Sequence, residues 1–207
     1  MADQAVLDAQ RTARGEQGRL HLGYVSSAMY DSKLPGLLRR LRADWPGIEL
    51  SLVQGDVQML YEALLDLRLD IAIIRAPLAS PPDALVVRPF VREKLCLALY
   101  QQHPLAGVGA LNLASLRTDN WISLDDPQGT GLEQVFMDAC RVAGFTPQVA
   151  QRINDVTSMI SLVSAGVGVA LVPLSARALR LDNVVYIDLQ DRLAESELRR
   201  GFYPPFL

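Results

Sequence analysis

The sequence predicts an α/β protein built from two small subdomains. Short apolar stretches typical of strands alternate with amphipathic stretches typical of helices through most of the chain. We count about nine strands, which is too many for a single regular α/β sheet in a chain of this length but suits two small sheets. A chain of 207 residues, 50% of them hydrophobic, is long enough to bury a sizeable core.

The first part of the chain reads as β-α-β-α-β. A strand is expected at 19–25, and leucines three and four residues apart then predict a helix that ends before Pro46. Apolar and polar residues alternate over 48–52, which predicts a second strand. A second helix follows Asp56, and a third strand is expected at 71–74. Consecutive units of this kind require a parallel sheet with right-handed crossovers.

The middle of the chain is expected to begin a second sheet. Three prolines within 76–83 predict a loop. Two separate apolar stretches follow, at 85–87 and 95–100, and the second of them is expected to start the new sheet. The elements expected after it are strands at 120–124, 147–153, 184–189 and 197–202, a loop at 125–131 and a helix at 132–143.

The stretch 155–173 predicts a helix that leads directly into a buried strand. Asp155 suits the helix N-cap, and Gly166 suits the left-handed residue at its end. The apolar run after Gly166 is too short for another helix, so we expect a parallel strand covered on both faces. The free amides of the first helical turn, beside the hydroxyls of Thr157 and Ser158, are typical of an anion site. The alternative is that the stretch is only core.

Composition and charge indicate whether the chain binds nucleic acid and in which cellular compartment it is expected. The formal net charge of -3 offers no basic surface for nucleic acid, so this chain alone is expected to bind DNA poorly. Cys96 and Cys140 lie among apolar residues without a C-x-x-C spacing, and we interpret both as small buried residues. The N-terminus lacks a cationic segment followed by an apolar core, and no run of about eighteen apolar residues occurs. The sequence therefore predicts a cytoplasmic protein without a membrane span.

The motifs of common enzymes and cofactor proteins are missing from the sequence. The chain has only two histidines, His21 and His103, and it has no G-x-S-x-G, P-loop or metal-spaced ligand set. The pair Gly166 and Gly168 follows a helix rather than a strand, which is the reverse of a dinucleotide fingerprint. We therefore expect no catalytic residue, no metal and no cofactor.

Several motifs occur together in one order. They are Val25-Ser26-Ser27, Leu34-Pro35-Gly36-Leu37-Leu38, Leu69-Asp70-Ile71-Ala72-Ile73, His103-Pro104-Leu105-Ala106 and Leu162-Val163-Ser164-Ala165-Gly166-Val167-Gly168 with Leu171-Val172-Pro173. On this set the chain resembles the effector-binding, or regulatory, domain of LysR-type transcriptional regulators. The resemblance implies a type 2 periplasmic-binding-protein fold, in which two Rossmann-like subdomains are joined by two crossing segments and a small ligand binds in the cleft between them.

The resemblance also implies a domain organisation. Residues 1–17 would be the tail of a linker helix, 18–92 with 192–207 would form regulatory subdomain I, and 93–191 would form regulatory subdomain II. DNA would be contacted only through an N-terminal winged helix-turn-helix domain that this chain does not contain. Domains of this family typically pair side by side, so we expect a homodimer, and a tetramer for the full-length protein.

The predicted effector site lies where strands end and helices begin. We expect a small organic effector there, an organic acid or an aromatic metabolite. In relatives that bind carboxylates the residue after Gly55 is often Ser or Thr, whereas here it is Asp56, whose charge repels an anion. The residues predicted to contact the effector are Ser26, Ser27, Asp56, Arg75, Gly129, Thr130, Val156 and Thr157.

Several of these residues have a purely structural alternative. Arg75 could pair with Asp56 or Asp155 instead of holding an acidic ligand group. The two serines could only cap the helix after them, and Gly129 with Thr130 could only shape a turn. The alternative functions for the whole chain are a transport-type solute-binding protein and an enzyme on the same fold.

Overall fold

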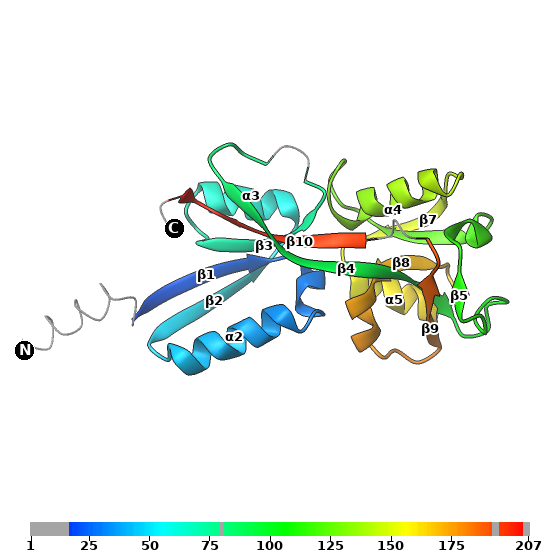
Figure 1. The fold of residues 1–207 in the computed structure, drawn as a ribbon, viewed down its shortest axis with the longest axis horizontal. Helices are drawn as coiled ribbons and strands as arrows, with labels where there is room; N and C mark the ends of the chain where they lie inside the picture. Colours follow the sequence, from blue (N-terminus) through cyan, green and yellow to red (C-terminus); the bar gives the residue numbers. More distant parts are fainter. Residues whose placement is uncertain (1–16, 79–80, 192–194, 205–207) are drawn as a thin grey trace, which may run out of the picture.

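Two lobes lie side by side in the computed structural model, which describes residues 17–78, 81–191 and 195–204 (Figure 1). Except for residue 17, the expected linker-helix tail at 1–17 lies outside the described residues. Two long strands run between the lobes (Figure 1). The fold is mixed α/β, as the sequence predicts, and its lobes are joined by two crossing segments.

The first lobe is a sheet with a helix on each face. Its elements are β1 (Gly18–Tyr24), the 3-10 helix η1 (Ser26–Met29), α2 (Lys33–Asp44), β2 (Ile48–Gln54), α3 (Val57–Leu65) and β3 (Ile71–Ala76). The three strands run parallel in the order β2-β1-β3. Ile73 packs with residues of α2 on one face, whereas its neighbours Ala72 and Ile74 pack with residues of α3 on the other. This alternation follows from the two-residue period of a strand.

The crossing strands are β4 (Val86–Tyr100) and β10 (Glu195–Phe202). β10 lies between β3 and β4 and is antiparallel to both. The sequence predicts two separate apolar stretches at 85–87 and 95–100. This prediction is wrong, because a single continuous strand, β4, spans both. Pro89 interrupts the apolar pattern, but it lies where the pairing with β10 is irregular, and a strand tolerates a missing N–H at such a place.

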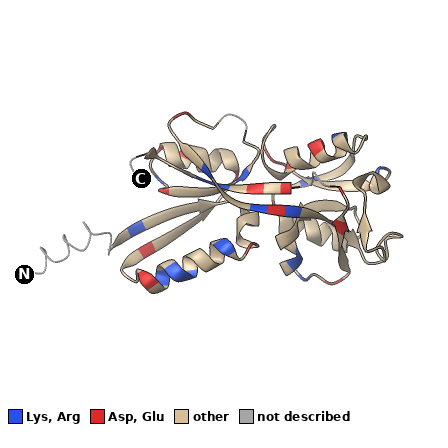
Figure 2. Cartoon of the chain, viewed as in Figure 1, with Lys and Arg blue, Asp and Glu red and all other residues tan. Residues whose placement is uncertain are grey.

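Opposite charges face one another on the two crossing strands (Figure 2). Glu195 is in register with Lys94, and Glu197 with Arg92. The Arg92 guanidinium lies 2.9 Å from the Glu197 carboxylate. Complementary cross-strand charges favour this register over a slipped one, and so they help to fix how the two lobes are connected.

The second lobe is built on the far half of β4. Its other elements are β5 (Ala110–Leu111), η2 (Leu113–Leu116), β6 (Asn120–Leu124), α4 (Gly131–Val142), β7 (Gln148–Ile153), α5 (Val156–Ser164), β8 (Ala170–Pro173), η3 (Leu174–Ala178) and β9 (Val184–Leu189). Strands β8 and β9 both pair with β4, and β6 and β7 form a separate parallel pair.

The strand after α5 differs from its expected orientation. The sequence predicts a parallel strand at 167–172, whereas β8 pairs antiparallel with β4. Val169, just before β8, forms an isolated parallel bridge with Trp121. All four residues of β8 are buried, as expected. Burial on both faces makes a strand apolar throughout but does not determine its direction, so the sequence pattern could not decide the pairing.

Each lobe has its own hydrophobic core. The second core contains the fully buried Trp121, whose ring lies 5.0 Å from the Phe136 ring and whose Nε1 donates a hydrogen bond to the Leu116 carbonyl at 3.2 Å. The two clusters of buried residues in the first lobe share no member with this core. Two cores joined by strands allow the lobes to move relative to one another.

The surface of α2 carries the exposed basic residues Arg39, Arg40 and Arg42 (Figure 2). No helix in the part of the chain that the structure describes combines the length and the hydrophobicity needed to cross a membrane. The apolar side of α2 packs into the core of the first lobe through Leu34 and Leu38.

Candidate functional site

A cavity of about 350 Å³ lies between the two lobes. Its walls come from the carboxyl ends of β1, β2, β3, β6 and β7 and from the starts of α3 and α4. Open α/β sheets bind their ligands at such converging strand ends. The lining residues are Val25, Ser26, Ser27, Gln54, Gly55, Asp56, Val57, Arg75, Leu124, Asp125, Asp126, Gly131, Leu132 and Asn154.

Four predicted site residues form much of the first-lobe wall. Ser26 and Ser27 follow β1 directly, and Arg75 lies near the end of β3. Asp56 is the N-cap of α3, where its Oδ1 accepts a hydrogen bond from the Met59 N–H at 2.8 Å. The carboxylate therefore both stabilises the helix start and faces the cavity.

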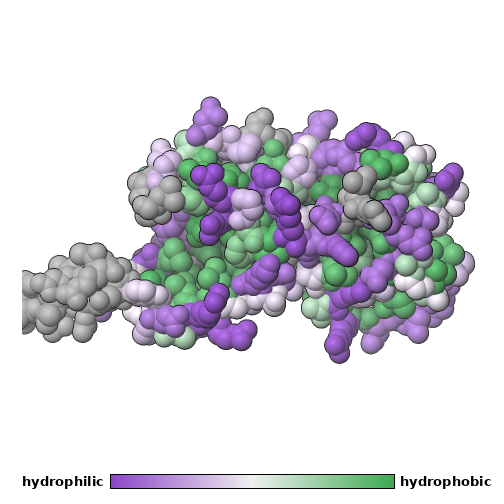
Figure 3. Space-filling view, in the orientation of Figure 1, coloured by the Kyte–Doolittle hydropathy of each residue, from purple (hydrophilic) through white to green (hydrophobic). Residues whose placement is uncertain are grey.

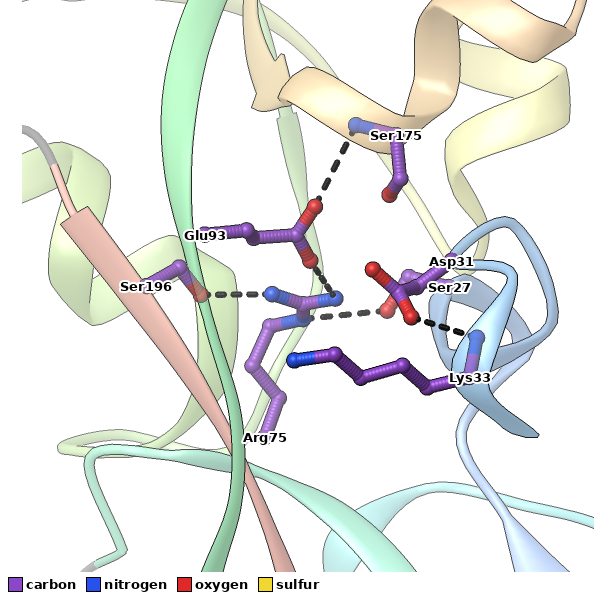
Figure 4. Close-up of polar contacts among 7 residues, drawn as sticks. All are labelled: Ser27, Asp31, Lys33, Arg75, Glu93, Ser175 and Ser196. Atoms are coloured by element: carbon purple, nitrogen blue, oxygen red, sulfur yellow. Dashed lines mark hydrogen bonds and ion pairs between the residues drawn. The ribbon is translucent and has the colours of Figure 1, made fainter. Parts of the chain in front are cut away.

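Arg75 is the only cationic residue among the described residues of this lining, and its guanidinium is engaged within the protein (Figure 4). Its Nε donates to the Ser27 hydroxyl at 3.0 Å, one Nη to the Ser196 hydroxyl at 2.6 Å and the other Nη to a Glu93 carboxylate oxygen at 3.0 Å. The side chains of Arg75 and Glu93 are only 3% and 8% exposed. Burial lowers the pKa of Arg75, and the charge of Glu93 opposes that shift.

Glu93 connects this cluster to the second lobe. Its second carboxylate oxygen accepts a hydrogen bond from the Ser175 N–H at 3.2 Å, at the start of η3 (Figure 4). The structural alternative for Arg75 named Asp56 or Asp155 as its partner, but the partner in the structure is Glu93. The ion pair thus ties β3, β4 and β10 to η3, close to the boundary between the lobes.

The second-lobe wall is acidic. The Oδ2 atom of Asp126 accepts a hydrogen bond from the Glu133 N–H at 3.1 Å, in the first turn of α4. Burial raises the pKa of Asp126, while hydrogen bonds from the α4 amides and the charge of Arg75 oppose the shift. Gly131 has a φ of 63°, and a Cβ there would clash with the Asp126 carboxylate, so this position favours glycine. The Gly131 N–H donates to the carbonyl of Pro77 in the first lobe at 2.9 Å.

The other four predicted residues, Gly129, Thr130, Val156 and Thr157, are not part of the lining. Val156 is fully buried in the second core, and the Thr130 hydroxyl donates to the Pro127 carbonyl at 2.5 Å. The Thr157 hydroxyl lies 2.8 Å from the hydroxyl of Tyr30, which belongs to the first lobe. These residues shape the turn, the core and a contact between the lobes.

The anion site expected at the start of α5 is already filled by the protein. Asp155 accepts hydrogen bonds from the Ser158 N–H at 2.9 Å and from the Ser158 hydroxyl at 2.7 Å. Burial alone would raise the pKa of Asp155, but the Ser158 hydrogen bonds lower it overall. A ligand carboxylate would have to displace this cap.

Four polar lining residues are missing from the predicted set: Gln54, Asp125, Asp126 and Asn154. Each lies at the end of β2, β6 or β7 or within two residues of it. The expected ends of β6 and β7, at 124 and 153, agree with the structure, so the strand-end rule contained the signal. The prediction instead chose residues further along, next to the helix starts.

A scan against protein families matches residues 13–202 to the LysR substrate binding domain. The chain is 35% identical over 198 residues to the HTH-type transcriptional regulator BudR of Raoultella terrigena, covering 96% of this chain and 68% of BudR. It is 36% identical over 178 residues to the HTH-type transcriptional regulator AlsR of Bacillus subtilis (strain 168), covering 86% of this chain and 58% of AlsR. The chain therefore spans about two thirds of BudR and less than two thirds of AlsR.

Among solved structures, the BenM effector binding domain with its effector benzoate has a similar fold. The TM-score is 0.78 at 23% sequence identity, covering 90% of this chain and 83% of that one. The fold is therefore that of LysR effector-binding domains, the type 2 periplasmic-binding-protein fold that the sequence predicts. Both curated relatives are named transcriptional regulators, which agrees with the expectation of a regulatory domain rather than an enzyme. This chain belongs to the LysR substrate-binding domain family, the effector-binding part of LysR-type transcriptional regulators.

Proposed function

We propose that this chain is the effector-sensing and oligomerisation domain of a cytoplasmic transcriptional regulator, which contacts DNA through a separate N-terminal domain. A small metabolite binds in the cavity between the lobes and changes the angle between them. The names of BudR and AlsR, both HTH-type transcriptional regulators, support the separate DNA-binding domain. The chain catalyses no reaction in this proposal.

One observation carries the proposal: the cavity is walled by strand ends from both lobes. A ligand that contacts both walls binds a closed arrangement more tightly than an open one. It can shift the equilibrium between them only by that difference in affinity. One or two charge-assisted hydrogen bonds, at about 1.5 to 3 kcal/mol each, are enough to shift it by factors of ten or more.

The proposed domain boundaries place 18–92 and 192–207 in subdomain I and 93–191 in subdomain II. Two features support them. Val91 packs in a core of the first lobe, whereas Leu95, four residues later on the same strand, packs in the core of the second. Leu198, near the other boundary, packs with Val91. The change of core within β4 marks the first crossing, and the start of β10 marks the second.

To test for an effector site, we would screen small metabolites by thermal shift and titrate each hit by calorimetry. A ligand at 100 times its Kd stabilises the folded chain by about 2.7 kcal/mol. Ser26→Phe and Asn154→Trp, from opposite walls, should each fill the cavity and abolish binding. Gly109→Ala, which adds a methyl group to open space outside the lining, should bind normally. Unchanged binding in both folded cavity variants would refute the site.

The proposed oligomer is a two-fold dimer through α2 and the edge strand β2. β2 lies at one end of an eight-stranded sheet that runs through both lobes in the order β2-β1-β3-β10-β4-β9-β5, with β8 beside β4. The residues on and beside β2 include Trp45, Leu52 and Val53, which are 43%, 41% and 37% exposed. Leu37 of α2 is 39% exposed. Figure 3 shows hydrophobic residues at the surface of the first lobe over β1 and β2. A second copy would cover them, and an unpaired edge favours such pairing.

Sedimentation equilibrium tests the dimer. The double variant Leu37→Glu and Leu52→Lys should be monomeric at tens of micromolar, where the wild type should be dimeric, because it places charges in the apolar contact. Val142→Glu, a charge on the exposed end of α4, is the matched control and should leave the contact through α2 and β2 intact. A wild-type monomer under these conditions would contradict the proposal.

A further inference from the structure

We infer that the cavity between the lobes selects a small organic cation, such as an amine with a short hydrocarbon part, rather than an organic acid. The inference rests on the proposed function, because it concerns the ligand of the same cavity. It follows from the charges on the walls, from the protein carboxylates that cap the helix starts at the cavity, and from the apolar part of the lining.

The lining has an uncompensated negative charge. Asp56, Asp125 and Asp126 contribute three carboxyl groups, and Arg75 is the one cationic residue in the described part of the lining. The Arg75 guanidinium is neutralised by Glu93 at 3.0 Å and is further engaged by two serine hydroxyls. Three of its five guanidinium N–H groups are therefore used within the protein, and only one N–H on each Nη is left for a ligand carboxylate.

The helix starts, which usually bind anions, are occupied by carboxylates of the protein itself. Asp56 accepts the Met59 N–H at the start of α3, and Asp126 accepts the Glu133 N–H at the start of α4. At the start of α5, beside the cavity, Asp155 fills the same role. A free anion would therefore meet a negatively charged cap at each of these three helix starts, so both common ways of holding a carboxylate are weakened here.

The remaining features favour an organic cation over a metal ion. No group of three or more His, Cys, Asp or Glu side chains within the described residues is arranged to hold a metal. The acidic residues instead stand on two walls of a cavity of about 350 Å³, which is the size of a small-molecule pocket. Val57, Leu124 and Leu132 give the cavity an apolar part. A hydrocarbon segment fits there while its ammonium group meets the carboxylates.

Pairs of ligands that differ mainly in charge test this directly. Benzylammonium is compared with benzoate, and butane-1,4-diammonium with succinate, by titration calorimetry near neutral pH and at one ionic strength. We expect each ammonium compound to bind at least about tenfold more tightly than its carboxylate counterpart. Carboxylates that bind as tightly as their ammonium counterparts, or a failure of both ammonium compounds to bind at millimolar concentration, would overturn the inference.

Two variants locate the effect. Asp125→Asn removes an exposed carboxylate of the wall that is not a helix cap, and it should weaken ammonium binding at least about tenfold. Asp182→Asn makes the same charge change at an exposed position outside the lining and should leave binding unchanged. Equal effects of both variants would mean that ammonium binding reports only the overall charge, and this too would overturn the inference.

The two proposals can fail separately. If carboxylates bind, and Ser26→Phe and Asn154→Trp abolish their binding, the cavity is an effector site but its charge preference is the reverse of the inferred one. If ammonium compounds bind and both cavity-filling variants leave their affinity unchanged, the ligand lies elsewhere and the proposed site itself is wrong.

Discussion

The hydroxyl groups of Tyr30 and Thr157 lie 2.8 Å apart and join the two lobes across their boundary. Tyr30 follows η1 in the first lobe, yet its ring packs against the hydrophobic core of the second, and Thr157 is in the first turn of α5. A side chain that belongs to one lobe and packs on the other holds the lobes in their present arrangement. Any opening of the cavity has to separate this pair.

Replacing Tyr30 by Phe should loosen the contact between the lobes. Loss of one hydrogen bond between partly exposed hydroxyls should cost about 0.5 to 1.5 kcal/mol in the free energy of unfolding. Small-angle scattering should also show a larger radius of gyration. In the control, Tyr186→Phe, the lost bond joins Tyr186 to the Leu179 carbonyl within the second lobe, so the radius should not change. Equal radii for Tyr30→Phe and wild type would rule out this role of the pair.

Glu93→Gln should destabilise the protein strongly. It leaves the buried guanidinium of Arg75 without its counter-charge, and breaking a buried ion pair in this way costs about 3 to 5 kcal/mol. Urea denaturation measures the loss. Glu49→Gln breaks the Arg19–Glu49 pair, whose side chains are each 66% exposed, and should cost no more than about 1 kcal/mol. A similar cost for both variants would mean that Arg75 is satisfied by the serine hydroxyls alone.

Asp126→Asn should change how stability depends on pH. Because burial raises the pKa of Asp126 above the ordinary 3.8, the unfolded chain loses this proton at a lower pH than the folded chain. The contribution of Asp126 to stability is therefore fully present below 3.8 and is lost as pH rises through the raised value. As pH rises from acidic to neutral, the free energy of unfolding of the variant should therefore increase relative to that of the wild type. Urea denaturation at a series of pH values measures this change.

Asp138→Asn is the control of opposite sign. Hydrogen bonds from Gln134 and Arg141 lower the pKa of Asp138, so its contribution is present above 3.8 and is lost as pH falls. As pH rises from acidic to neutral, the free energy of unfolding of this variant should therefore decrease relative to that of the wild type. If the two variants shift in the same direction, the buried environment assigned to Asp126 is incorrect.

Gly168→Ala should disturb the junction of β6 with the segment before β8. A Cβ at Gly168 would lie 2.5 Å from the backbone oxygen of Asn120, which accepts a hydrogen bond from the Val169 N–H at 2.8 Å. Backbone cannot move aside as a flexible side chain can, so we expect a loss of about 1 to 3 kcal/mol in thermal or urea unfolding. Gly109→Ala, with open space around its Cβ, should be nearly neutral.

Periodicity in the sequence predicts the two-lobe α/β fold because most elements bury one clear face. It fails at β4, where Pro89 and charged neighbours hide one long strand, and at β8, where complete burial leaves the direction open. In both cases the outcome depends on pairing with strands distant in sequence: β10 continues the pairing of β4 past Pro89, and β4 sets the direction of β8. Local patterns do not encode such pairing.

The site could be predicted only in part for the same reason. Strand ends at Ser26, Asp56 and Arg75 are visible in the sequence, and all three residues line the cavity. The pairing of Arg75 with Glu93, on the neighbouring crossing strand, depends on the position of β10 between β3 and β4 and on side-chain directions. The residue with the clearest ligand-binding chemistry thus proved to be engaged within the protein.

A crystal structure of the chain with the metabolite that stabilises it most would test the central claim directly. The proposal predicts electron density for that molecule between Ser26 and Asp56 on one wall and Asp125 and Asn154 on the other, with the lobes closer together than in the free chain. Density for the bound molecule at any other place, with this cavity empty, would contradict it.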